Sequence, residues 1–168
     1  MSLDSISIWL ISLLKRRGLD RADGRLLFAY DLSEEEHASL SRVLGSAIAD
    51  AGGIEALAIR CLGRTPALAP PAAFVLFAAE WWKREYEGGV WDWSPIIEKL
   101  DTDPESFPAQ LRSEFVARGL SFWQLSPLSS GKRFIGSIVV NGGIPMRLLA
   151  HGAGPLATVL SQVLALAS

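Results

Sequence analysis

Hydrophobic and polar positions follow a helical period along most of the chain. After Ser33, apolar residues recur at spacings of three and four, which predicts one buried helical face reaching about Ala51. Ser33 and Glu36 stand three residues apart at the start of this run, as in a capping box. Two glycines follow Ala51, and glycine commonly ends a helix. We therefore expect a capped amphipathic helix here.

The same spacing predicts further helices on both sides. The first contains the apolar run Ile6–Leu14 and ends in basic residues, which suit the negative end of a helix dipole. The other expected helices cover residues 54–62, 71–87, a short stretch capped by Ser94 with Pro95 as its first residue, and 105–118 with a glycine cap at Gly119-Leu120.

Two runs are ambiguous between helix and strand. Residues 25–32, with the sequence RLLFAYDL, are the best strand candidate, and residues 134–140 fit either structure. The two runs could pair as a small two-strand accessory. The fold class predicted for residues 1–168 is mostly α, a compact single domain of about seven or eight helices.

The helix expected at 71–87 carries charged residues opposite its apolar arc. Glu80 precedes Arg84 by four residues, and Lys83 precedes Glu87 by four, so both pairs can form ion pairs along the helix. This pattern predicts a solvated face. The apolar arc opposite contains Phe74, Phe77, Ala78, Trp81 and Trp82.

Glu85 falls within the apolar arc of the same helix. An unpaired carboxylate there would be costly, so we expect an ion pair that ties the helix end to a neighbour. Arg60 and Arg112 are the candidate partners. A functional carboxylate is the alternative.

Composition narrows the class of protein. Of 168 residues, 49% are hydrophobic and 20% charged, which is typical of a folded globular domain. A net charge of −2 gives no general attraction for nucleic acid. The single cysteine, Cys61, excludes an intrachain disulfide and a cysteine-rich zinc site.

The first residues do not read as an export signal. Asp4 precedes the apolar run and Lys15 follows it, the reverse of the charge order of a secretory signal. The run is also shorter than the roughly 20 residues that span a bilayer. We expect a cytoplasmic protein without a membrane partner.

The last residues are apolar and uncharged. No acidic or basic residue follows Arg147, and one helical stripe consists of Leu156, Val159, Leu160, Val163, Leu164 and Ala167. Such a helix would be poorly soluble if it were free. It either packs into the core or continues into further polypeptide, and we expect the chain to be the N-terminal module of a longer protein.

Signatures of catalysis or metal binding are scarce. His37 and His151 lack the spacing of zinc ligands, and Cys61 faces inward beside other apolar residues. No nucleophile elbow or phosphate loop occurs. The expectation is therefore no metal and no cofactor. An enzyme with Glu85 and His37 as acid–base groups is the alternative of lowest rank.

Residues 78–93, AAEWWKREYEGGVWDW, hold four of the six tryptophans. Aromatic stripes usually belong to a core, but tryptophan and arginine are also enriched in interface hot spots. The hypothesis is a docking surface for a protein partner or a downstream domain, formed by Trp82, Arg84, Glu85, Tyr86, Trp91 and Trp93. The alternative is nucleic-acid binding that combines ring stacking with Lys15, Arg16, Arg17, Lys132 and Arg133.

Three stretches of the chain carry a resemblance to a known family. They are FAAEWWKREYEGGVWDWSPIIEKL, RLLFAYDLSEEEHASL and RFIGSIVVNGGIPMRLL, and together they span most of residues 25–149. They resemble the N-terminal region of a family of large, poorly characterised bacterial proteins associated with anti-phage defence neighbourhoods. The resemblance implies an N-terminal module attached to larger downstream machinery, and we expect that module to be a non-catalytic interaction or regulatory domain. It supplies no catalytic residues for this region.

Overall fold

The computed structural model describes residues 2–63, 67–127 and 134–149, and within these ranges the chain is helical and contains no strand. The α-helices are α1 (Ser2–Arg16), α2 (Glu34–Ala51), α3 (Ile54–Cys61), α4 (Ala69–Glu85), α5 (Ser94–Glu98), α6 (Ala109–Phe122), α7 (Ile135–Gly142) and α8 (Met146–Leu149), and the 3-10 helices are η1 (Leu27–Tyr30) and η2 (Pro104–Ser106). The mostly helical class is thereby confirmed.

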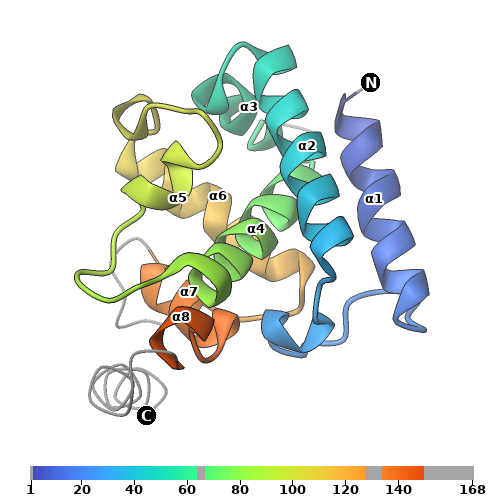
Figure 1. The fold of residues 1–168 in the computed structure, drawn as a ribbon. Coiled ribbons are helices and arrows are strands. Elements are labelled where there is room, and N and C mark those ends of the chain that lie inside the picture. The colour runs from blue at the N-terminus through green and yellow to red at the C-terminus, as the bar shows by residue number, and fades with distance from the viewer. Residues whose placement is uncertain (1, 64–66, 128–133, 150–168) are drawn as a thin grey trace.

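Helix α4 runs through the middle of the molecule and contacts helices α1, α2, α6 and α7 around it (Figure 1). Every residue from Pro70 to Glu80 is buried, as expected for a helix that is apolar on all sides. Two prolines occupy its first turn, where a missing N–H costs nothing. It ends at Glu85, before the double glycine that the sequence pattern indicates, because Tyr86 already takes an extended conformation.

Helices α1 and α2 form an antiparallel pair beside α4 (Figure 1). The Trp9 indole N–H of α1 donates to Ser39 Oγ of α2 at 3.1 Å. The capping box of Ser33 and Glu36 is confirmed, with both reciprocal hydrogen bonds present. Gly52 ends α2 in the left-handed conformation, at φ 90°, as predicted.

Helix α6 continues through Gly119, so the predicted cap at that residue is wrong. A Cβ added to Gly119 would lie 2.3 Å from the carbonyl oxygen of Pro71 and 2.8 Å from Val75 Cγ1. Helix α6 crosses α4 so closely at this residue that the contact leaves no room for a side chain. A sequence pattern cannot distinguish this use of glycine from a helix cap.

The predicted two-strand accessory is also wrong. Residues 27–30 form η1, and residues 135–142 form α7. The Leu27 backbone N–H donates to Asn141 Oδ1 at 3.0 Å, so a buried side chain supplies the acceptor that a neighbouring strand would have offered. Leu27 and Tyr30 are both fully buried and lie three residues apart, which suits the tight turn of a 3-10 helix.

Buried apolar residues from Ile6 to Leu148 belong to one hydrophobic cluster. The apolar stripe at residues 156–167 lies outside the described residues, so the single domain over 1–168 stays a prediction. Among the described helices, none combines the length and the apolar character needed to cross a membrane.

Candidate functional site

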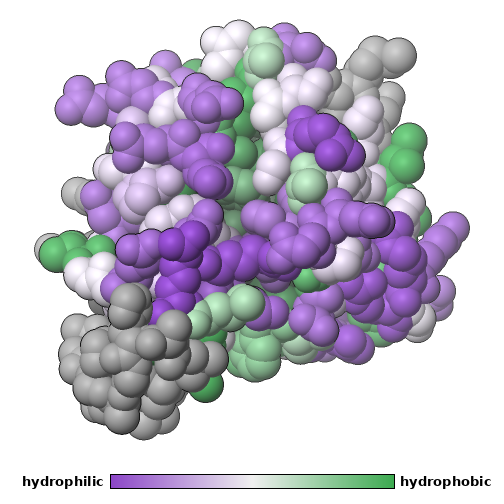
Figure 2. Space-filling view, in the orientation of Figure 1, coloured by the Kyte–Doolittle hydropathy of each residue, from purple (hydrophilic) through white to green (hydrophobic). Residues whose placement is uncertain are grey.

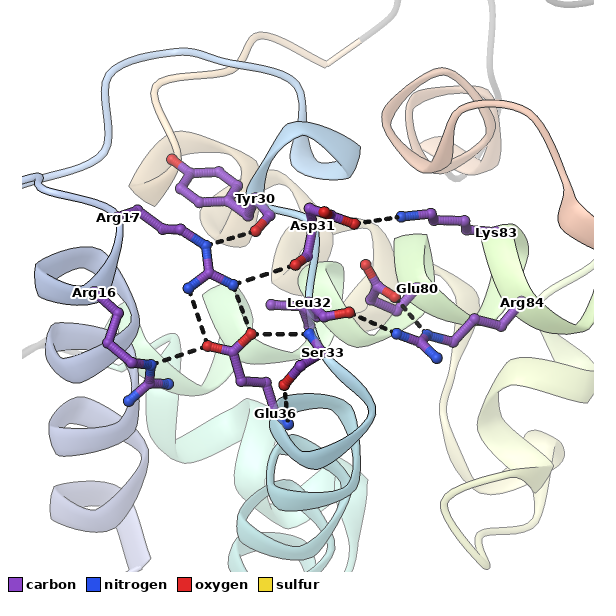
Figure 3. Close-up of polar contacts among 10 residues, drawn as sticks. All are labelled: Arg16, Arg17, Tyr30, Asp31, Leu32, Ser33, Glu36, Glu80, Lys83 and Arg84. Atoms are coloured by element: carbon purple, nitrogen blue, oxygen red, sulfur yellow. Dashed lines mark hydrogen bonds and ion pairs between the residues drawn. The ribbon is translucent and has the colours of Figure 1, made fainter.

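Two arginines, one just after α1 and one in α4, hold the segment that joins η1 to α2 (Figure 3). Arg17, just after α1, donates from Nε to the Tyr30 carbonyl oxygen at 2.7 Å and from Nη2 to the Asp31 carbonyl oxygen at 3.3 Å. Arg84 of α4 donates from Nη2 to the Leu32 carbonyl oxygen at 2.7 Å. Three consecutive carbonyl groups are therefore satisfied by guanidinium groups. Asp31 itself adopts φ 49° at this bend.

Glu36 is the acidic centre of the same network. It accepts hydrogen bonds from Arg17 Nη2 at 2.5 Å, Arg16 Nε at 2.9 Å and the Ser33 backbone N–H at 2.9 Å. Burial raises the pKa of Glu36, but the hydrogen bonds from Arg17, Ser33 and Arg16 outweigh that effect and bring the pKa to about 2. The carboxylate therefore stays ionised and joins α1 to the start of α2.

Glu80 and Arg84 form the predicted pair along α4, with 2.7 Å between Glu80 Oε2 and Arg84 Nε. The predicted solvated face is nevertheless wrong, because Glu80 is only 2% exposed. Arg84 also contacts Glu34 at 2.6 Å, and Lys83 pairs with Asp31 at 3.5 Å instead of with Glu87. The segment that precedes α2 covers this end of α4.

A groove of about 830 Å³ runs between α1 and α2. We call it the α1–α2 groove. One end is polar and contains Arg16, Arg17 and Glu36. Further along it lie Trp9 and Ser39, and the far end is lined by Ser5, Ile8, Arg42 and Val43. Its lining residues are spread along both helices, so the groove follows the helix axes.

One of two exposed isoleucines of α1 lines this groove. Ile8 is 65% exposed and lines it, while Ile11 on the same helix is 52% exposed. The buried stripe of α1 includes Ile6, Leu10 and Leu13. The groove was not predicted, although Ile8, an apolar residue outside that stripe, is a signal from which it could have been found.

The rings of the predicted docking surface lie mainly inside the molecule. Trp82, Tyr86 and Trp93 are 3%, 4% and 2% exposed, and Trp91 is half-buried. These three rings are therefore not exposed, and a docking surface at this stretch stays a prediction. Trp82 stacks on Tyr86 with ring centroids 4.0 Å apart and donates to the Gly143 carbonyl oxygen at 2.9 Å.

The cavity among these aromatic residues is small. Trp82, Tyr86 and Trp91 line a space of about 20 Å³, which is near the size of one water molecule. Trp93 lies deeper, stacked on Phe74 at 5.7 Å and within 5.8 Å of the Arg112 guanidinium. Among the described residues, the aromatic side chains therefore fill most of the space between them.

Glu85 forms the ion pair that its position in the apolar arc predicts. Its partners are Arg147 at 2.7 Å and Lys99 at 3.4 Å, and neither Arg60 nor Arg112, the two candidates from the sequence, is among them. The pair ties the end of α4 to α8. Arg147 lies 62 residues away in the chain, so spacing along the sequence could not indicate it.

His37 forms no hydrogen bond with Glu85 within the described part of the chain. Its ring stacks on Phe77 at 6.0 Å, and its buried Nδ1 has no hydrogen-bond partner within the described part of the chain. Burial lowers the pKa of His37, and the nearby Arg84 cation lowers it further. Neither His37 nor Glu85 lines the α1–α2 groove. That groove therefore cannot bring a substrate to the proposed acid–base pair.

Three of the five predicted nucleic-acid residues lie in the described part of the chain. Arg16 and Arg17 are engaged by Glu36, and Lys15 is exposed. Lys132 and Arg133 lie outside the described residues. Nucleic-acid binding therefore stays a prediction, and the geometry adds nothing in its favour.

The thiol and the metal-binding residue types give no further site. Burial raises the pKa of Cys61 to about 11, so the thiol is inert, as its inward position predicts. Across residues 2–63, 67–127 and 134–149, no three His, Cys, Asp or Glu side chains gather closely enough to hold a metal ion.

Comparison with known proteins identifies a family and one curated relative. The family profile described as YjiT N-terminal domain matches residues 2–144. Protein YjiT of Escherichia coli (strain K12) is 31% identical over 161 residues, which cover 93% of this chain and 28% of that relative. No solved structure matches the chain.

Proposed function

The chain belongs to the YjiT N-terminal domain family, and on that basis we propose that it is a non-catalytic docking module of a larger bacterial protein. The proposed occupant is a segment of further polypeptide in the same protein. The chain spans only 28% of the length of its E. coli relative, which leaves ample polypeptide to supply such a segment. The observation that carries the proposal is the α1–α2 groove.

The shape of the groove suits a peptide segment better than a small molecule. Small-molecule sites enclose most of the ligand surface in a concave and mainly apolar pocket. The α1–α2 groove is an open trough of about 830 Å³ between two antiparallel helices. A helix or extended segment can lie along such a trough and place its side chains between the two helices.

The groove also indicates the chemistry of its occupant. Ile8 and Val43 supply an apolar contact at the far end, and Arg42 lines the groove beside them. Arg42 is exposed and forms no ion pair with any side chain that the structure describes. Arg16 and Arg17, in contrast, are already paired with Glu36. We expect the segment to carry an apolar residue near a carboxylate.

The buried aromatic cluster takes a structural role in this proposal. Trp82 and Tyr86 connect α4 to the segment after it, and their rings are covered by the chain itself. Contact with the downstream polypeptide is therefore assigned to α1 and α2 instead of to the tryptophan-rich stretch.

Photocrosslinking in the full-length protein tests the proposal. A benzoylphenylalanine at Ile8 should crosslink to residues downstream of this chain, because that side chain lies at the groove. Arg42→Glu should lower the yield by about five-fold or more through charge repulsion. The crosslinked peptides are identified by mass spectrometry.

Ile59 of α3 provides the matched control position, since it is 59% exposed and lies outside the groove. Arg60→Glu on the same helix is the matched charge reversal. Equal yields from Ile8 and Ile59, or no downstream crosslink from Ile8, would refute the docking proposal. Crosslinks that join two copies of the protein would also contradict it.

We further propose that the full-length protein serves in anti-phage defence. Support comes from the resemblance of residues 25–149 to proteins found in defence neighbourhoods. In this proposal the module has a regulatory role, which the α1–α2 groove supports by offering a place for another segment to bind.

A further inference from the structure

An apolar patch lies at the end of the molecule where the described chain leaves α8. It consists of Leu26, Phe28, Ile144 and Met146, which are 37%, 41%, 48% and 52% exposed. We call it the end patch. Figure 2 shows hydrophobic residues gathered below a hydrophilic band, over the region of η1 and α8. Contiguous exposed apolar surface of this kind usually marks an interaction site.

The end patch is built from two segments that are distant in sequence and packed together. A Cβ added to Gly143 would lie 3.1 Å from Phe28 Cγ, so the Phe28 side chain rests directly on that glycine. Ile144 and Met146 follow Gly143 in the chain. The Leu27 N–H to Asn141 hydrogen bond fixes η1 against α7 beside this contact. The patch is therefore a preformed surface.

The point where the chain leaves this surface is also fixed. Arg147 of α8 donates to the Arg84 carbonyl oxygen at 3.1 Å and to Glu85 at 2.7 Å, and it also pairs with Glu87. Leu148 is 1% exposed. These contacts anchor α8 to the end of α4, so the residues after Leu149 begin next to the end patch.

We propose that residues 155–168 form an amphipathic helix that packs its apolar stripe on the end patch. The stripe contains Leu156, Val159, Leu160, Val163, Leu164 and Ala167, and no charged residue follows Arg147. Pro155 suits the first turn of such a helix. The helix would be about 21 Å long at 1.5 Å per residue.

The linker between α8 and this helix is long enough for the packing. Residues 150–154 can span up to about 17 Å when extended, at roughly 3.4 Å per residue. Two glycines, Gly152 and Gly154, allow the sharp turn that brings the helix back over the patch. The short tether also raises the effective concentration of the helix to the order of millimolar, which favours it over a second copy of the chain.

Hydrogen exchange measured on the 168-residue chain tests this packing. Amides of residues 156–168 should be protected in the native chain. Leu160→Asp places a charge on the stripe and should speed their exchange by about ten-fold or more, because burial of that charge would be costly. Gln162→Asp, which lies off the stripe, is the matched control and should change exchange by less than about two-fold.

Disulfide trapping identifies what covers the patch. Phe28→Cys is combined in turn with Leu160→Cys, Val163→Cys or Leu164→Cys, and the buried Cys61 stays unreactive. At least one pair should form an intramolecular disulfide, whereas the same partners combined with Ile59→Cys should not. Only intermolecular disulfides, which would indicate a second copy, or equal exchange in the Leu160 and Gln162 variants would overturn the proposal.

Discussion

The carboxylate of Glu36 joins more of the molecule than its position in the first turn of α2 suggests. It caps α2 through Ser33 and also receives Arg16 and Arg17 from the end of α1. Arg17 in turn holds the carbonyl groups of the segment before α2. Loss of this one charge would therefore weaken both the cap and the contact between the two helices.

We predict that Glu36→Gln lowers the free energy of unfolding by roughly 2–3 kcal/mol at pH 7, since the native pKa lies near 2 instead of 4.5. A glutamine can still cap the helix, but it cannot pair with two arginines. Glu35→Gln changes an exposed carboxylate in the same turn and should cost less than about 0.5 kcal/mol. Urea unfolding of the three proteins gives these differences.

The dependence of stability on pH distinguishes the contribution of Glu36 from that of His37. The stabilisation from Glu36 is present above pH 4.5 and is lost as the pH falls toward 2, so the wild type and Glu36→Gln should converge in that window. The lowered pKa of His37 affects stability at a higher pH than Glu36 does. Its neutral form is favoured in the fold, so its contribution falls below about pH 6.5 in both proteins. A difference between the two proteins that stayed constant from pH 7 to pH 2 would contradict the role given to Glu36.

From the sequence, only the contacts between residues close together in the chain could be predicted at this site. The capping box was predictable because its partners are three residues apart. The role of Arg17 was not, because it depends on backbone carbonyl groups 13 and 14 residues away. Glu85 shows the same limit. Burial cost predicted that an ion pair would form, but only the fold brings Arg147 to it.

At the scale of helices, two glycines with similar sequence context have opposite roles. Gly119 lies inside α6 at the crossing with α4, where a Cβ would overlap Pro71. Gly45 lies inside α2, and no atom comes within 4 Å of the position of an added Cβ. Helix propensity alone predicts the same effect of replacing either glycine, whereas the packing around them predicts different effects.

The two substitutions should therefore change stability with opposite signs. Gly119→Ala should lower the free energy of unfolding by about 1–3 kcal/mol, because the methyl group forces α6 away from α4. Gly45→Ala should raise it by up to about 1 kcal/mol through helix propensity alone. Thermal and urea unfolding measure both. An Ala at position 119 that stabilised the chain would contradict the close crossing.

Helix α4 shows why helices were predicted more accurately than the faces that they bury or expose. Its existence follows from apolar content and from its prolines, and both were visible in the sequence. Its charged face was misassigned because Glu80 is covered by the segment before α2, which is a tertiary contact. The strand predicted at 25–32 failed for a related reason, since Asn141 supplies its acceptor from a distant helix.

At the scale of the whole molecule, the groove and the defence proposal can be tested together. A host that expresses the full-length protein should resist phage, and Arg42→Glu should reduce that protection because it disrupts the proposed docking contact. We expect a loss of about ten-fold or more in plaque suppression, because a reversed charge at the groove should weaken docking. Arg60→Glu should retain protection. Equal plaque counts for the two variants would contradict the link between the groove and defence.

Helix α1 begins at Ser2, and its first turns contribute Ser5 and Ile8 to the far end of the α1–α2 groove. In Figure 1, α8 lies at the opposite end of the molecule. An affinity tag or fluorescent protein fused ahead of Ser2 would stand at the mouth of the groove and compete with whatever enters it. A purification tag placed there would thus inhibit binding in the groove. Fluorescent labels that report this binding should be attached to the exposed surface of α3.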